Sequence, residues 1–238
     1  MDVLLVGESW HEVSMTVKSQ NVTMSSSYVE AGAYLIAALE SAGADVTYQP
    51  CHVAHETFPR TRSGLSYDLV ILSDVGAQTL LLTPEVAGGT LGTNRLELLA
   101  EYVDDGGAVG MIGGYMSFAG ENGQAGYART PLADVLPVEI SAYDDRIERP
   151  SGVRPRNQGL EELPTEWPPV LGYNRVSASG DGEVLATVDG DPLVVVGEYG
   201  DGSSFAFTAD CAEHWAPTQF LEWERLPDLW SAILSRVV

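Results

Sequence analysis

Side chains that can carry acid–base chemistry lie close behind apolar runs of the sequence. Glu8 and Asp74 each end such a run, and His214 follows a third one shortly after it ends. Two carboxylates and an imidazole can supply a general acid, a general base and hydrogen-bonding groups. If the runs are parallel strands of one sheet, their carboxyl ends share an edge, which is where ligands bind in open α/β sheets.

A glycine-rich turn follows another apolar run. Gly113-Gly114-Tyr115-Met116-Ser117 has the outline of a nucleophile elbow, in which a tight turn presents one side chain above the sheet. Small residues flank that position because the turn is sterically crowded. Tyr115 occupies it here, and a phenol with a pKa near 10 is a poor nucleophile but a good hydrogen-bond donor. The alternative is an ordinary glycine-rich loop.

Neighbouring residues are candidates for contact with a ligand. Asp74 would orient a polar substrate, and backbone N–H groups near Gly76, Gly114 and Met116 would stabilise developing negative charge. The remaining candidates are two aromatic residues on the same segments, Trp10 and Trp215. The sequence lacks the tight His/Asp spacing of a metal site, so we expect no metal ion and no cofactor.

The elements that position these groups alternate between strands and helices, which predicts an α/β fold with a mostly parallel sheet and helices on both faces. We predict a single domain over residues 1–238, with an irregular elaboration at about 121–169 that holds only short strands such as 138–141. The predicted strands are 3–6, 45–48, 69–72, 109–112, 183–188, 193–199 and 203–208, and the predicted helices are 28–42, 94–104 and one or two within 220–238.

The charge balance excludes some partners. The chain has 34 acidic and 12 basic residues, a formal net charge of −22, and Lys18 as its single lysine. Nucleic-acid binding depends on clustered Lys and Arg, so we expect none. The start of the chain has no secretory signal and no apolar run is long enough for a membrane span, which predicts a cytoplasmic protein with no membrane partner. The acidic, lysine-poor composition favours a halophilic protein over a merely acidic one.

Arginines concentrate in the irregular middle of the chain. They would form an anion-binding patch, pair with Asp144, Asp145 and Glu148, or line a subunit interface. The five residues are Arg129, Arg146, Arg149, Arg154 and Arg156.

Several motifs together resemble the putative glutamine amidotransferase family, which is related to the ThuA-like proteins. The resemblance runs essentially end to end and implies a flavodoxin-like sheet of the class I glutamine amidotransferase kind, assembled as a homo-oligomer. The motifs are Val3–Trp10, Leu72–Ala77, Met111–Phe118, Thr130-Pro131 with Val135–Val138, Leu171–Arg175, and Asp210 with His214-Trp215.

The resemblance also implies a departure from the family's chemistry. Working class I amidotransferases place a catalytic cysteine at the elbow and a histidine in a later loop. Here Tyr115 stands at the elbow and His214 falls where the histidine is expected, so we expect no glutaminase activity. Cys211 is either a displaced nucleophile close to His214 or a buried small apolar residue.

Two functions remain open at this point. The first is a hydrolase or related enzyme acting on a small polar molecule, with His214 as base or acid, Tyr115 as donor, and Glu8 or Asp74 orienting the substrate. The second is a noncatalytic protein that binds a small molecule or supports an assembly and retains the amidotransferase fold.

Overall fold

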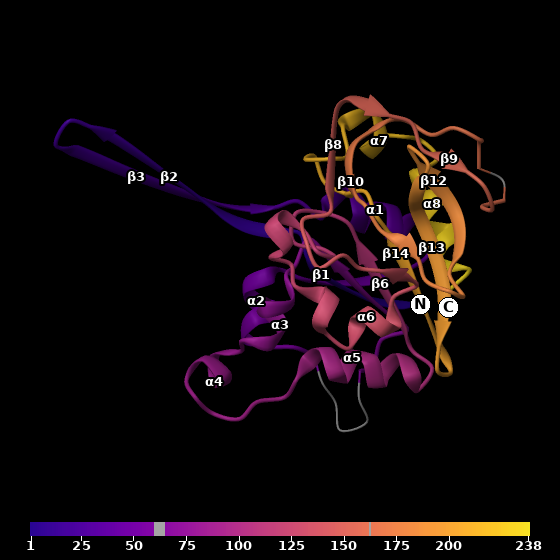
Figure 1. Ribbon diagram of the computed structural model, residues 1–238, viewed down its shortest axis with the longest axis horizontal. Helices are drawn as coiled ribbons and strands as arrows, with labels where there is room; N and C mark the ends of the chain where they lie inside the picture. Colours follow the sequence, from indigo (N-terminus) through magenta and orange to yellow (C-terminus); the bar gives the residue numbers. More distant parts are fainter. Residues whose placement is uncertain (60–64, 162) are drawn as a thin grey trace.

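The computed structural model describes residues 1–59, 65–161 and 163–238, and its centre is one large sheet (Figure 1). The order is β4-β1-β5-β6-β14-β13-β12-β9. Adjacent strands from β4 to β14 pair in parallel, and β13, β12 and β9 continue the sheet in antiparallel fashion. The strands are β1 (Asp2–Gly7), β4 (Asp45–Gln49), β5 (Leu69–Ser73), β6 (Ala108–Ile112), β9 (Arg156–Asn157), β12 (Glu183–Val188), β13 (Asp191–Tyr199) and β14 (Gly202–Phe207).

Helices cover both faces of this sheet, as the alternating pattern predicts. Alternate residues of the buried strands face opposite sides, so Leu5 and Ile71 join one core while Leu4 and Val70 join the other. On the first side lie α1 (Ala33–Ser41), α7 (Thr218–Leu221) and α8 (Leu226–Leu234), and on the second lie α2 (Cys51–Glu56), α3 (Ala77–Leu81), α5 (Arg95–Asp104) and α6 (Leu132–Val135).

The predicted helix at 94–104 is confirmed by α5, whose N-cap Asn94 accepts hydrogen bonds from the N–H groups of Leu96 and Glu97. A cap of this kind satisfies N–H groups that the first turn leaves without partners. The C-terminal helices are also confirmed, as two short ones, α7 and α8. A further short helix, α4 (Pro84–Ala87), begins at the capping residue Thr83.

The predicted start of the first helix is wrong. Residues 9–30 form a long hairpin, β2 (Ser9–Lys18) and β3 (Asn21–Glu30), and α1 begins only at Ala33. The sequence between Val13 and Met24 alternates apolar and polar residues, which is the period of a strand. Figure 1 shows this hairpin extending away from the body of the protein.

The middle of the chain is more ordered than predicted. An eight-residue strand, β8 (Arg146–Val153), pairs with β10 (Val170–Asn174), and β7 (Val138–Glu139) pairs with β11 (Ser177–Ala178). Pro150 and Gly152 interrupt the strand pattern of β8 in sequence, because both residues are normally depleted in strands. Two single turns, η1 (Glu121–Gly123) and η2 (Tyr127–Arg129), precede α6.

The arginines of this region pair mainly with carboxylates. Arg146 contacts Asp144 at 2.8 Å and Glu121 at 3.2 Å. The prediction of pairing within the cluster is therefore confirmed for Asp144, whereas Asp145 and Glu148 bind other groups described below. Two further pairs are Arg149 with Asp189 at 2.6 Å and Arg156 with Glu166 at 3.6 Å.

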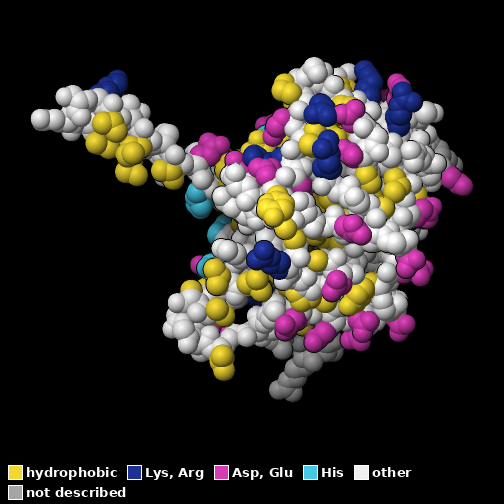
Figure 2. Space-filling view, in the orientation of Figure 1, with side chains coloured by type: hydrophobic (Ala, Val, Ile, Leu, Met, Phe, Trp, Pro, Cys, Tyr) yellow, Lys and Arg dark blue, Asp and Glu magenta, His cyan; other side chains and the backbone are white. Residues whose placement is uncertain are grey.

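Acidic side chains are spread over much of the face shown in Figure 2. With a net charge of −22, their mutual repulsion opposes the compact state. We expect the melting temperature to rise by about 5 °C or more between 0.1 M and molar KCl, because the screening length falls from about 10 Å to about 3 Å and about 2–4 °C corresponds to 1 kcal/mol at this size. Calorimetry measures this, and a flat or falling melting temperature would contradict it.

Candidate functional site

The turns after β1 and β5 carry the two predicted carboxylates in matching positions. Gly7 is in register with Ser73, and the next residue in each strand, Glu8 or Asp74, has a left-handed backbone with φ near +45°. Such conformations are uncommon in residues other than glycine and tend to occur at functional sites. The two turns bring the carboxylates to the same edge of the sheet.

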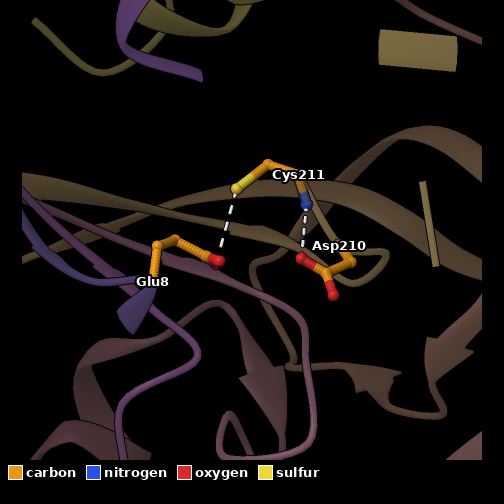
Figure 3. A group of neighbouring side chains, drawn as sticks. All are labelled: Glu8, Asp210 and Cys211. Atoms are coloured by element: carbon orange, nitrogen blue, oxygen red, sulfur yellow. Dashed lines mark hydrogen bonds between the residues drawn. The ribbon is translucent and has the colours of Figure 1, made fainter. Parts of the chain in front are cut away.

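Glu8 is buried in a polar cluster, shown with two of its neighbours in Figure 3. Its Oε1 accepts a hydrogen bond from Ser73 Oγ at 2.5 Å and from Cys211 Sγ at 3.5 Å. Its Oε2 is also buried and has no hydrogen-bond partner within the described part of the chain. Asp210, equally buried, accepts at Oδ1 from the N–H groups of Cys211 and Ala212 at 2.7 and 3.0 Å.

This cluster retains protons. Burial raises the pKa of Glu8 well above its ordinary value, and the charges of Asp210 and Asp74 raise it further. The pKa of Asp210 is also raised well above its usual range, by burial first and then by Asp74. Carboxylates that cannot all ionise together hold a proton at a pH where free carboxylic acids have lost it.

Asp74 fixes the glycine-rich turn. Its Oδ1 accepts the Met116 N–H at 2.6 Å, and its own N–H donates to Ser117 Oγ at 3.1 Å. A Cβ on Gly114 would lie 2.6 Å from Asp74 Oδ1, so only glycine fits beside that carboxylate. The predicted oxyanion contact at Met116 is therefore wrong for this conformation, because the Met116 N–H already has an anionic partner. The Met116 side chain lies against Gly76.

The positive φ within residues 113–117 falls on Gly114, at +153°, and not on Tyr115. The Tyr115 side chain is held by several partners. Its hydroxyl donates to Glu148 Oε1 at 3.0 Å. The centre of its ring lies 4.1 Å from the centre of the His214 ring in an edge-on arrangement, and the Arg146 guanidinium lies 4.5 Å from the Tyr115 ring centre. Burial and Glu148 both raise the pKa of the phenol. Tyr115 is therefore a protonated donor bound to Glu148, in contact with His214 as the shared sheet edge predicts.

His214 is exposed at the same edge of the sheet. Its Nδ1 lies 3.5 Å from Asp210 Oδ2, with 37% of the histidine side chain and 4% of the aspartate side chain exposed. Desolvation lowers the pKa of His214, although the charges of Glu148 and Asp74 oppose this shift. A neutral imidazole can accept a proton. The contact is longer than an ordinary hydrogen bond.

Two aromatic candidates lie elsewhere than expected. Trp10 belongs to β2, where its indole N–H donates to Glu12 Oε1 at 3.2 Å, so it is part of the hairpin and not of a site loop. Trp215 is fully buried and its N–H donates to Glu148 Oε2 at 3.1 Å. We correct its role from ligand contact to support of Glu148, because a buried ring whose N–H is used cannot meet a ligand.

Sequence reasoning did not place several residues in the site that help to build it. Asp145 is buried and accepts hydrogen bonds from the N–H groups of Ala119 and Gly120 and from Asn174 Nδ2. Asn174 in turn accepts the Gly114 N–H at 3.0 Å. Asp210 had one available signal, its position three residues after the end of β14 and four residues before His214. Glu148 had none, because β8 is remote in sequence from its partners.

Neither cysteine is suited to nucleophilic attack in this conformation. Cys211 is buried, and its pKa is raised well above the ordinary value by burial, Glu8 and Asp210. Burial is also the main cause of the raised pKa of Cys51. The thiolate is the reactive form, so both environments disfavour it.

A hollow of about 1390 Å³ lies at the opposite edge of the sheet. Its lining includes Asp68 and Gly107, which precede β5 and β6, together with Glu101, Asp105 and Asp201. We favour the carboxyl edge as the site, because the charged side chains that line the opposite hollow are acidic apart from Arg236, and its described lining includes no imidazole.

The mostly parallel sheet, covered by helices on both faces and carrying polar groups at its carboxyl edge, defines an α/β protein of the amidotransferase-like class. The family model described as "Putative glutamine amidotransferase" matches residues 2–238. The chain belongs to this family. No curated protein sequence matches the chain.

Solved structures agree with this assignment. "Cytoplasmic Protein STM1381 from Salmonella typhimurium LT2" is 40% identical with a TM-score of 0.95, covering 100% of this chain and 99% of its own. "Cytoplasmic Protein STM3548 from Salmonella typhimurium" is 37% identical with the same TM-score and coverage. A ThuA-like protein from Parabacteroides merdae shares the fold at 14% identity, with a TM-score of 0.56 and coverage of 100% and 91%.

Among the described residues, no helix is both long and apolar enough to cross a membrane.

Proposed function

We propose that this protein is a cytoplasmic hydrolase of the amidotransferase-like fold that acts on a small polar molecule without glutaminase chemistry. The His214–Asp210 pair at the carboxyl edge carries this proposal, since it places an exposed base against a buried carboxylate. In chain order the parallel strands run 2-1-3-4-5, the flavodoxin-like order, which supports a site at this edge. The proposal includes that Tyr115 stands at the position where working amidotransferases have their catalytic cysteine.

Each group has a role that its surroundings permit. His214 would take a proton from water as the oxygen attacks the substrate carbon, and would return that proton to the leaving group. Asp210, whose Oδ2 faces Nδ1 of His214, would orient the imidazole. Asp74, half-buried beside the turn, would accept a hydrogen bond from the substrate. Glu8 is buried, so we assign it a positioning role in place of the catalytic one first expected.

The noncatalytic alternative has its own support. Tyr115 and Trp215 fill space beside His214, with ring centres 4.1 Å and 5.2 Å from the imidazole. The Met116 N–H, which an acyl-transfer reaction would use, is taken by Asp74. A protein that only binds a small molecule would tolerate both features.

Hydrolysis of p-nitrophenyl esters, amides and glycosides, with ammonia release from glutamine as a further assay, tests the proposal. We expect turnover of at least one chromogenic substrate and no ammonia from glutamine. His214→Ala should lower the hydrolytic rate by about 10²–10⁴-fold, the usual contribution of a general base. His11→Ala, on the exposed hairpin, is the matched control.

Further results would distinguish the hydrolase from the noncatalytic alternative. Because the pKa of His214 is lowered, the base stays neutral and active to a lower pH than an ordinary histidine allows. Turnover unchanged in His214→Ala would contradict the proposal, and the absence of turnover on every substrate would favour the noncatalytic alternative. Ammonia release that disappears in Cys211→Ala would show that a cysteine acts as nucleophile after all.

A further inference from the structure

The hairpin β2–β3, which we call the arm, has an apolar face open to solvent. Its register places Met15 opposite Met24 and Val17 opposite Val22, so their side chains lie on one face. Together with Val13, these side chains are each between 59% and 67% exposed. Figure 2 shows them as a patch along the arm, well away from the body.

The other face of the arm is polar. Ser14, Thr16, Thr23 and Ser25 occupy the alternating positions, and Ser14 Oγ lies 2.6 Å from Ser25 Oγ. An antiparallel ribbon with one apolar and one polar face has the pattern of a sheet that buries one side. In this chain the body lies too far from the outer arm to cover that side (Figure 1).

Near its root the arm contacts α2 through Ser9, whose Oγ accepts the Cys51 N–H at 2.8 Å, and through the ring of Tyr28. The Tyr28 ring lies 5.0 Å from His11 and 5.2 Å from His52 of α2. A two-stranded ribbon by itself is marginally stable in water. The outer part of the arm, with five exposed apolar residues, therefore needs a partner surface to become stable.

The distribution of charge over the arm and the body indicates which partner the arm binds. Between Val13 and Val29 the one charged residue is Lys18, the single lysine of a chain whose net charge is −22. Two such bodies repel each other, whereas the outer arm carries no carboxylate. Acidic residues return at the root as Glu12 and Glu30. The arm is thus positive at its tip and negative at its root.

We propose that the arm is a dimerisation element whose apolar face packs against the same face of the arm of a second copy. A two-fold axis makes such a contact self-complementary. The arms then run in opposite directions, and the positive tip of each arm lies near the root of the partner's arm, where Glu30 is on the same face as Met15 and Val17. The outer arm meets the partner without bringing two acidic bodies face to face.

Sedimentation of the full chain in molar KCl tests the dimer. The wild type should sediment at twice its mass of 25.5 kDa. The double variant Met15→Lys with Met24→Lys should be monomeric, with dimer dissociation raised at least about 100-fold, since charge replaces the apolar contact. Thr16→Lys with Thr23→Lys makes the same charge change on the polar face and should remain dimeric. Unchanged melting of the body would show that all three proteins fold.

A carbodiimide cross-link tests the arrangement of the arms. Because Lys18 is the single lysine, its amide bonds to carboxylates are easy to assign by mass spectrometry. We expect links between copies from Lys18 to Glu30, lost in Lys18→Arg while the dimer persists. Links from Lys18 only to carboxylates of the body would overturn the arm-to-arm arrangement.

Three further outcomes would overturn the dimer proposal. A monomeric wild type, or a Met15→Lys, Met24→Lys variant that dimerises as tightly as the wild type, would overturn the proposal. Binding of a monomeric wild type to neutral lipid vesicles, lost in that variant, would assign the arm to a membrane and overturn it as well.

Discussion

Gly7→Ala is expected to abolish cooperative folding. A Cβ at this position would lie 1.8 Å from the carbonyl oxygen of Ser73, and the backbone φ is +118°, a value that only glycine adopts without strain. The clashing atom belongs to the backbone of the neighbouring strand, so relief requires β1 and β5 to separate where Glu8 and Asp74 leave the sheet. We expect the free energy of unfolding to fall by more than about 4 kcal/mol, a loss that is typical of such disruptions of backbone and packing.

Chemical denaturation and circular dichroism measure this effect. Gly180→Ala is the matched control, because a Cβ at that position would have no heavy atom within 4 Å and the backbone there is not left-handed. We expect the control to unfold within about 0.5 kcal/mol of the wild type, as surface substitutions usually do. A Gly7→Ala protein that unfolds cooperatively near the wild-type midpoint would show that the two strands part more easily than their register suggests.

Glu8→Gln is expected to stabilise the protein at pH values above neutral. The folded state holds a proton on Glu8 more tightly than the unfolded state does, because burial, Asp210 and Asp74 raise its pKa. The stability from this group is therefore complete below the unfolded pKa of about 4.3 and is lost as the pH rises through the folded value. Glutamine cannot lose that proton, and its carbonyl can still accept from Ser73.

Thermal unfolding in molar KCl measures the difference. At about pH 8 the variant should melt several degrees above the wild type, at about 2–4 °C for each kcal/mol, and near pH 4 the gap should close. Glu101→Gln, an exposed residue of α5, removes the same charge without the buried cluster and should change little. A Glu8→Gln variant that melts lower at both pH values would mean that the ionised carboxylate is needed in the fold.

The sequence predicts most of the sheet because the information for it is local. Apolar runs bounded by glycine and polar residues correctly mark β4, β5, β6 and β12–β14, and Asn94 marks the start of α5. The arm has an equally local signal, the alternation around Met15 and Met24, but none of the predicted strands covers it. Its apolar residues are few and interleaved with Ser and Thr, and the strands pack against no core, so the pattern has no buried run to draw attention to it.

The sequence likewise predicts only part of the candidate site. The positions of Glu8, Asp74, Tyr115 and His214 follow from the sequence, because a residue after a parallel strand must lie at the carboxyl edge. Tertiary structure alone decides what each one can do there. Glu148 reaches Tyr115 and Trp215 from positions 33 and 67 residues away in sequence, and Asp210 and Glu8 keep protons because the fold buries them together. Spacing along a chain records the period of its elements, whereas burial and long-range hydrogen bonds, which set protonation and accessibility, exist only once those elements have packed.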